Sequence, residues 1–246
     1  MAHAGISRTS IQRDHALITP ESHVELRLPG WRDAPAVVLI SRELGAGFAQ
    51  YLVHAGPGAH VRPLDPTHEY LALVLDGSID LSCASGTEVL DAEGYAYLPA
   101  GQPWVIDSAH GAELLLFAKR YVPVTGIAAP ALLVSRIADI AAAPFLGDTS
   151  ALLRCLLPDD PAWDWGINVF EFAPGGTLPN VETHFMEHGL YMLAGQGVYR
   201  LGERWYPVLS GDAIWMAPYL TQWFAATGKT PSRYVYYKEM NRAPGA

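Results

Sequence analysis

The chain has 246 residues, of which 50% are hydrophobic and 17% are charged, so it carries enough apolar material for a substantial core and is not a disordered chain. Its formal net charge of −9 gives no electrostatic reason to bind nucleic acid or an anionic membrane surface. A chain of this length forms either one large β domain or two smaller domains.

The N-terminal segment has no apolar stretch of about 7–15 residues, which a secretory signal needs, and no run approaches the ~18 apolar residues of a membrane helix. The two cysteines, Cys83 and Cys155, form neither a close pair nor a disulfide framework, which is typical of reduced thiols. We therefore expect a soluble, cytoplasmic protein.

In chain order, the predicted elements are short apolar or alternating runs separated by Gly, Pro and Asp. The runs cover residues 36–41, 70–82, 96–101, 112–124, 167–176, 189–201, 213–218 and 232–240. Their content of Val, Ile, Tyr and Phe indicates the strands of an all-β sandwich or barrel. The one helix that the pattern suggests is Ser135–Phe145, which Pro144 would end.

The same order of strands and turns occurs twice along the chain. Gly77 and Gly195 lie 118 residues apart, and so do Trp104 and Gln222. This spacing predicts an internal duplication of a β-barrel unit, with the join near residues 125–150. We place an N-terminal barrel with an N-terminal arm in residues 1–130 and a C-terminal barrel in residues 131–246.

Three polar residues lie at regular spacing between Gly176 and Gly195. The stretch reads Gly-x5-Glu-x-His-x3-His-x6-Gly, with Glu182, His184 and His188 in the polar positions. On a strand these three side chains would share one face, because their numbers have the same parity. The spacing matches the first part of the cupin metal-binding pattern. The alternative is two hydrogen-bonded core histidines and a surface glutamate.

The second part of the cupin pattern is a Gly-rich turn followed by a further ligand, and here Gly211 is followed by Gln222. Two imidazoles, a carboxylate and an amide oxygen form a hard donor set. Such a set suits Mn²⁺ or Fe²⁺ with positions left for water or substrate, whereas Zn²⁺ would favour a tetrahedral N/S set. The sequence thus predicts one metal site, formed by Glu182, His184, His188 and Gln222.

The N-terminal half breaks this pattern. Aligned on its turn glycine, it has these residues in the four ligand positions: Leu64, Pro66, Tyr70 and Trp104. None of these residues is expected to bind a metal, so we predict that the N-terminal barrel is metal-free. His68 and Glu69 lie nearby but out of register, and we expect them to be exposed or structural.

Several stretches carry a resemblance to a known family. The run ETHFMEHGLYMLAGQGVYRL from Glu182, the pattern W-x-PV-x2-GD in Trp205–Asp212 and Y-x2-Q in Tyr219–Gln222 resemble motifs of the (S)-ureidoglycine aminohydrolases. KRYVPVTG in Lys119–Gly126 and ALITP in Ala16–Pro20 fit the same family. The resemblance covers nearly the whole chain. It implies an all-β bicupin fold of two tandem double-stranded β-helix (jelly-roll) barrels.

The resemblance also implies an activity. It is that of a Mn²⁺-dependent hydrolase of a linear amidine-type C–N bond, which converts (S)-ureidoglycine to (S)-ureidoglycolate and ammonia in purine and allantoin catabolism. The partner is then a small ureide, with no nucleic acid and no membrane. Glu182, His184, His188 and Gln222 would hold the metal. We also expect a homo-oligomer.

Three further residues match positions that the family uses around the substrate: Tyr199, Tyr234 and Lys238. Glu182 is the candidate for proton transfer to the leaving amine. Tyr234, Tyr236 and Lys238 share one face of a predicted strand, and Lys238 could bind the substrate carboxylate. The plainer alternatives are that Tyr199 fills the core and that Lys238 is a solvated strand-end lysine.

Two other functions compete with this hypothesis. One is an Fe²⁺-dependent cupin dioxygenase acting on a small carboxylate, because two histidines and a carboxylate also support oxygen chemistry. Gln222 counts against it, since a fourth protein ligand leaves fewer positions for both O₂ and substrate. The other is a non-enzymatic ligand-binding bicupin.

Overall fold

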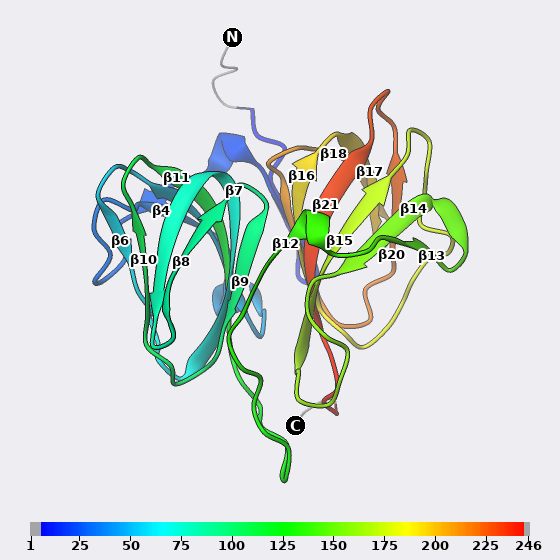
Figure 1. The fold of residues 1–246 in the computed structure, drawn as a ribbon. Coiled ribbons are helices and arrows are strands. Elements are labelled where there is room, and N and C mark those ends of the chain that lie inside the picture. Colours follow the sequence, from blue (N-terminus) through cyan, green and yellow to red (C-terminus); the bar gives the residue numbers. More distant parts are fainter. Residues whose placement is uncertain (1–5, 244–246) are drawn as a thin grey trace. The chain divides into compact units, whose positions relative to one another are not determined.

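The computed structural model describes residues 6–243 and separates into two compact units. The N-terminal unit is Val24–Asp139, and the C-terminal unit combines the segment up to His23 with the segment from Ile140 onward. Strands dominate both units (Figure 1), so the predicted all-β class is confirmed. Within residues 6–243, no helix is long and apolar enough to span a membrane.

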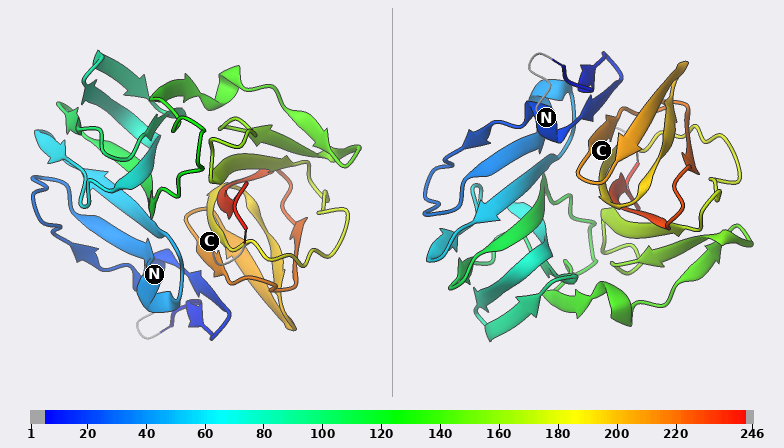
Figure 2. Two further views of the ribbon diagram at one scale, coloured as in Figure 1. Left: turned by 90° about the horizontal axis from the view of Figure 1, so that it is seen from below. Right: turned by 90° about the horizontal axis from the view of Figure 1, so that it is seen from above.

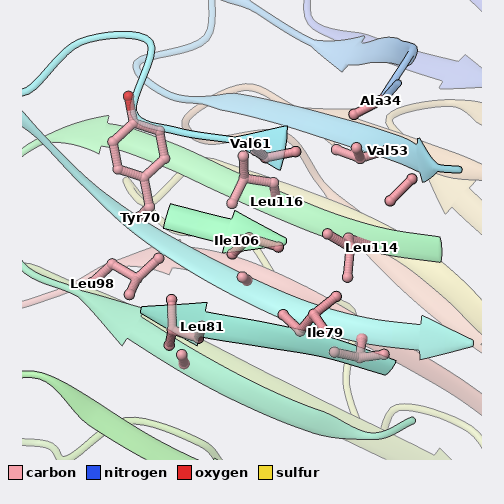
Figure 3. Close-up of a cluster of buried hydrophobic side chains, with 14 of the residues drawn as sticks. Ala34, Val53, Val61, Tyr70, Ile79, Leu81, Leu98, Ile106, Leu114 and Leu116 are labelled. Carbon is pink, nitrogen blue, oxygen red and sulfur yellow. The ribbon is translucent and has the colours of Figure 1, made fainter. Parts of the chain in front are cut away.

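The N-terminal unit is built from ten strands and two 3-10 turns among the described residues. They are β3 (Glu25–Leu26), β4 (Ala36–Ile40), η2 (Arg42–Leu44), β5 (Ala49–Ala55), β6 (Ala59–Val61), β7 (His68–Cys83), β8 (Gly86–Asp91), β9 (Gly94–Leu98), β10 (Trp104–Ser108), β11 (Ala112–Arg120), β12 (Leu133–Arg136) and η3 (Ile137–Asp139). The sheet order is β12-β9-β7-β11-β5-β4-β3, and β10 and β8 also pair with the long strand β7. Alternate residues of these strands form an apolar core, shown in Figure 3.

The C-terminal unit has two sheets. Its elements are β1 (Ser10–Ile11), β2 (His15–Ile18), η1 (Pro20–Ser22), β13 (Ala143–Phe145), β14 (Asp148–Cys155), β15 (Trp165–Phe172), β16 (His188–Ala194), β17 (Gln196–Leu201), β18 (Arg204–Leu209), β19 (Ala213–Met216), β20 (Gln222–Ala226) and β21 (Ser232–Glu239). The larger sheet has the order β1-β2-β19-β16-β21-β15-β14-β13, and the smaller one is β18-β17-β20. Figure 2 shows how the strands of this unit surround its own interior.

The predicted helix at Ser135–Phe145 is wrong. Leu133–Arg136 is strand β12, paired antiparallel with β9, and Ala143–Phe145 is strand β13, paired with β14. Only the 3-10 turn Ile137–Asp139 lies between them in the described chain, and its Ile137 is buried. The segment has too few apolar residues at helical spacing to resist strand pairing with two different sheets.

The units differ from the predicted division at residue 130. The residues up to His23 belong with the C-terminal unit, because β2 pairs antiparallel with β19 from Ala213↔Ile18 to Met216↔His15. The Arg8 guanidinium adds a two-pronged ion pair to the buried Asp212 carboxylate, at 2.6 and 2.8 Å. The N-terminal arm is therefore an edge of the C-terminal sheet, and its partners lie some 200 residues away in sequence.

The internal repeat has a local structural counterpart. Gly77 in β7 and Gly195 before β17 have positive φ values of 75° and 77°. A Cβ atom would collide with a backbone carbonyl in both places, that of Gly111 for Gly77 and that of Pro231 for Gly195. Both positions therefore require glycine, because the chain turns tightly beside a neighbouring strand.

Candidate metal centre and substrate cavity

The C-terminal unit contains a cavity of about 160 Å³ that collects the predicted site residues. Its lining is Phe145, Phe170, Leu178, Glu182, His184, Met186, His188, Leu190, Tyr199, Met216, Gln222, Tyr234, Tyr236 and Lys238. All seven candidate ligands and substrate residues named from the sequence are in this set. Most of the remaining lining is apolar, which suits a site that must weaken competition from water.

Glu182 and His184 lie in an irregular segment ahead of β16, and not on a strand as their parity suggested. This segment is tied by backbone hydrogen bonds to the turn before β20. Glu182 and Gln222 exchange two backbone hydrogen bonds of 2.9 Å, and the Tyr219 amide donates to the His184 carbonyl at 2.7 Å. Glu182 and His184 therefore approach Gln222 because the loop pairs with the turn before β20. They do not share the face of one strand.

His188 opens strand β16, directly opposite Met216 on β19 and Lys238 on β21. Its Nδ1 atom lies 2.9 Å from the Tyr237 carbonyl oxygen. A carbonyl only accepts hydrogen bonds, so Nδ1 carries the proton and Nε2 is left with a free lone pair. That Nε2 faces the Nε2 atom of His184 at 3.2 Å.

The amide of Gln222, the first residue of β20, completes this group. Its Nε2 lies 3.1 Å from His184 Nε2, and its Oε1 accepts a hydrogen bond of 3.3 Å from the Tyr199 hydroxyl. The two atoms of a side-chain amide are assigned from their hydrogen bonds, and a 180° rotation would exchange them. Either way, two imidazole nitrogens and one amide group point to the same place.

Burial sets the charge of the site. It lowers the pKa of His188 to about 3, helped by the neighbouring His184 and Lys238 and opposed by the Tyr237 carbonyl. Burial also lowers the pKa of His184. The pKa of Glu182 is raised by burial, although the positive charge of Lys238 opposes this. At neutral pH both imidazoles are therefore uncharged, as metal ligands must be.

The phenols that line the cavity are neutral for the same reason. Burial raises the pKa of Tyr199 and Tyr234 well above the ordinary range. Both side chains are about 2% exposed, so they also pack in the core of the unit. The two interpretations of Tyr199 are therefore compatible: it fills the core and its hydroxyl reaches Gln222.

Only some of the four predicted metal ligands lie close together in the described residues. Within residues 6–243, no three His, Cys, Asp or Glu side chains come close enough together to hold an ion. Glu182 lines the cavity without joining the two imidazoles in such a group. What fits is the donor chemistry: two neutral imidazoles, one of them oriented by a backbone carbonyl, beside an amide and a carboxylate.

The corresponding place in the N-terminal unit is filled by aromatic side chains. Tyr70 and Trp104 pack edge to face with ring centroids 5.1 Å apart, and the Tyr70 hydroxyl bonds to the backbone of Asp65. Glu69 is fully buried and accepts a hydrogen bond of 2.7 Å from Tyr97, so its role there is structural. This edge-to-face ring pair occupies the position where the C-terminal unit has His188 and Gln222.

A cavity residue, Tyr236, and its hydrogen-bond partner, Asn168, were not predicted as site residues. Tyr236 lines the cavity from β21, and its hydroxyl accepts a hydrogen bond of 3.1 Å from the Asn168 amide on β15. Its parity with Lys238 was noted in the sequence, but no role was assigned to Tyr236. The sequence carries no signal for Asn168, since its pairing with Tyr236 depends on the register of two strands far apart in the chain.

Comparisons with known proteins agree with this fold and extend to nearly the whole chain. A family model described as "Cupin domain" matches residues 168–237. The rice protein named "Probable (S)-ureidoglycine aminohydrolase" is 44% identical over 98% of this chain and 77% of its own length. The Arabidopsis thaliana (S)-ureidoglycine aminohydrolase is 40% identical over 98% of this chain and 80% of its own length.

Solved structures give the same result at the level of the fold. The protein Ylba from E. coli aligns with a TM-score of 0.87 and 31% identity, over 98% of this chain and 97% of its own. Bacillus subtilis oxalate decarboxylase, studied for its Mn(II) centres, aligns with a TM-score of 0.69 over 92% of this chain and 78% of its own. At 12% identity the second match concerns the fold alone.

Proposed function

Because the chain belongs to the (S)-ureidoglycine aminohydrolase family, we propose that the cavity of the C-terminal unit is its active site. The protein is a hydrolase that releases ammonia from (S)-ureidoglycine and gives (S)-ureidoglycolate, a step of allantoin catabolism. The observation that carries the proposal is the convergence of Glu182, His184, His188 and Gln222 on one cavity of the C-terminal unit. Within this reading, the two units form a bicupin whose N-terminal half lacks the ligand set.

The proposed metal ligands are His184, His188, Gln222 and Glu182, and the proposed metal is Mn²⁺, with Fe²⁺ as the alternative. A hard divalent cation bound by nitrogen and oxygen donors supplies Lewis-acid stabilisation of charge on the substrate. The Nδ1–H of His188 donates to the Tyr237 carbonyl, which holds the imidazole ring in position and keeps Nε2 unprotonated.

The substrate makes modest demands on the chain. Its reacting carbon bears an amine and a ureido nitrogen, so the ureido lone pair assists departure of the amine once that amine is protonated. Glu182 is the proposed proton donor and acceptor, because its carboxyl lines the cavity and burial raises its pKa above the ordinary value. Lys238 is the only cationic group that lines the cavity in the described chain, and it is the proposed partner of the substrate carboxylate.

Tyr199 and Tyr234 are proposed to border the substrate. Both phenols are protonated, and Tyr199 donates to Gln222, so it fixes the amide that lies beside His184. Their burial also excludes water from the wall of the cavity. The family to which the chain belongs favours hydrolysis over the dioxygenase and the non-enzymatic alternatives. A homo-oligomer and a cytoplasmic location are further proposals about the whole protein.

The test of this function is ammonia release from freshly generated (S)-ureidoglycine. We expect the purified protein loaded with Mn²⁺ to release ammonia faster than the spontaneous background. His188→Ala should lose this activity, and added Mn²⁺ should no longer raise its melting temperature, because a bound ligand stabilises only the folded state that binds it. Cys83→Ser, in the N-terminal unit, is the matched control and should keep both properties. Wild-type turnover by His188→Ala without metal would refute the site.

A further inference from the structure

Strands β15 and β21 bring two unassigned residues opposite two cavity residues. In their antiparallel register, Asn168 is paired with Tyr236 and Gly166 with Lys238. Tyr236 and Lys238 are two positions apart on β21, so their side chains leave the same face of the strand about 7 Å apart. Both side chains line the cavity.

The ring of Tyr236 is held in place by its neighbours. It stacks on Phe170, with ring centroids 5.6 Å apart and an angle of 13°, and meets the imidazole of His188 edge to face at 5.4 Å. The hydroxyl accepts a hydrogen bond of 3.1 Å from Asn168. Asn168 is 2% exposed and Tyr236 is half-buried, so the amide end of this contact is shielded from solvent.

With the Asn168 amide oriented as in this structure, its hydrogen bond constrains where the phenol proton points. Asn168 donates its amide N–H, so the lone pair of the Tyr236 oxygen that faces Asn168 is occupied. The O–H bond must therefore point elsewhere, and Asn168 is the hydroxyl's one hydrogen-bond partner within residues 6–243. Because the Tyr236 side chain lines the cavity, we take its O–H donor to be available to an acceptor on a bound ligand.

Gly166 serves the second side chain. A Cβ atom at this position would lie 3.2 Å from Lys238 Cε and would collide with the sulfur of Met240. Contacts as close as this force the neighbour to move. The absence of a side chain at Gly166 thus leaves space for the Met240 side chain and for the stem of Lys238.

We propose that Tyr236 and Lys238 form a two-pronged clamp for a carboxylate, in which the phenol and the ammonium each donate to the anion. In this arrangement Asn168 is a positioning residue that aims the Tyr236 proton, and Gly166 makes room for the lysine. The clamp deepens the proposed function, on which it rests, because it assigns the carboxylate end of the substrate. The ligand class is a small carboxylate that carries a ureido group.

A stable probe separates this clamp from turnover. Ureidoacetate has the carboxylate and ureido group of the substrate without the reactive amine, and ureidoacetamide is its neutral counterpart. Binding is measured by calorimetry on the Mn²⁺-loaded protein. Tyr236→Phe should bind ureidoacetate about 10–100-fold more weakly, as expected for a lost hydrogen bond to a charged group, and should bind ureidoacetamide almost as the wild type does. The phenyl ring keeps the packing against His188 and Phe170.

Asn168→Leu tests the positioning role. Alone, it should weaken ureidoacetate binding about 3–10-fold, because the phenol proton is no longer directed. In the Tyr236→Phe background it should cause no further loss of binding, because no hydroxyl remains to be aimed. The melting temperatures should show a different pattern from the binding affinities, because adding Asn168→Leu to Tyr236→Phe should raise the melting temperature. Tyr236→Phe leaves the buried amide of Asn168 without its partner and lowers the temperature, and the double variant recovers part of that loss.

Two results would overturn the clamp while leaving the proposed function intact. One is unchanged ureidoacetate affinity in Tyr236→Phe when the wild type releases ammonia from ureidoglycine. The other is an equal weakening by Asn168→Leu in both backgrounds, which would make its role purely structural. If instead the wild type releases no ammonia but the variants show the predicted binding pattern, the clamp stands and the proposed reaction fails.

Discussion

At the scale of single residues, the cavity holds one carboxyl group and one lysine, and we assign them different roles. Glu182 and Lys238 line the same cavity, and each affects the other, since the positive charge of Lys238 opposes the upward shift of the Glu182 pKa. Burial dominates that balance and favours the protonated carboxyl. A carboxyl in this setting can transfer a proton, whereas the lysine ammonium suits the binding of an anion.

Substitution of these two residues should give different kinetic signatures. Glu182→Gln keeps an oxygen donor but cannot exchange a proton near neutral pH, so it should retain much of its Mn²⁺ and lose mainly kcat, by about 10²–10⁴. Lys238→Met keeps the stem and removes the charge, so KM should rise about 10–100-fold with metal content unchanged. Steady-state kinetics with metal analysis measures both. Metal loss in Lys238→Met together with a pure KM effect in Glu182→Gln would reverse the two roles.

The buried His188 should make stability depend on acid. Its folded-state pKa of about 3 lies below the ordinary value of 6.5, so the unfolded chain binds a proton that the folded chain does not. Above pH 6.5 the His188 imidazole is neutral in both states, so it does not lower the free energy of unfolding. Below it, metal-free protein should lose about 1.4 kcal/mol of stability per pH unit from this group, down to about pH 3.

Thermal unfolding of metal-free protein between pH 7 and pH 4 checks this dependence. Carboxylates titrate in the same range, so the comparison is with His188→Asn, which has no proton to bind here. The variant should show a shallower loss of melting temperature below pH 6.5. Parallel curves for the two proteins would mean that His188 is not held neutral in the folded state.

At the scale of elements, the sequence specified strands well and loops poorly. Alternation and turn glycines located most strands, because a half-buried strand must alternate and a tight turn needs a positive φ. Parity placed Tyr234 and Lys238 correctly in the cavity, since both lie on β21. The parity rule applies only to residues on one strand, so it could not predict the positions of Glu182 and His184. These residues approach each other through loop pairing with the turn before β20.

The N-terminal arm shows a second kind of limit. Nothing in the run from His15 to Ile18 indicates that it pairs with β19, because the signal would be a register between segments about 200 residues apart. The same holds for Asn168 and Tyr236, whose contact depends on the register of β15 and β21. Such pairings follow from tertiary packing, which a single sequence does not display locally.

The arm should be a measurable part of the C-terminal unit. Arg8→Met removes the partner of the fully buried Asp212 carboxylate, which then keeps only the Leu209 amide within residues 6–243. We expect a loss of about 2–3 kcal/mol, since Arg8 is a quarter exposed and solvent screens part of the pair. Arg42→Met is the matched control, because that guanidinium is 90% exposed beside Glu43. Equal stability of both variants in denaturant titration would deny the arm this role.

At the scale of the whole molecule, the same arrangement of turns and strands occurs in both units, but different side chains occupy the interior of each. Gly77 and Gly195 turn the chain in the same way in the two units, and Trp104 and Gln222 each begin a strand with the same burial pattern. In the N-terminal unit Trp104 packs on Tyr70, and such an aromatic pair stabilises a dry core. In the C-terminal unit the same positions are polar and open on a cavity.

This asymmetry predicts the metal content of the protein. The ring pair of Tyr70 and Trp104 leaves no nitrogen or carboxylate oxygen at the place where His188 and Gln222 offer donors, so the N-terminal unit should bind no catalytic ion. Elemental analysis after Mn²⁺ loading and desalting should therefore give about one equivalent per chain. His184→Ala should reduce this value towards zero, because it removes the imidazole that lies within 3.2 Å of both His188 Nε2 and Gln222 Nε2. A value of two equivalents, or one equivalent that survives His184→Ala, would place an ion outside the C-terminal cavity.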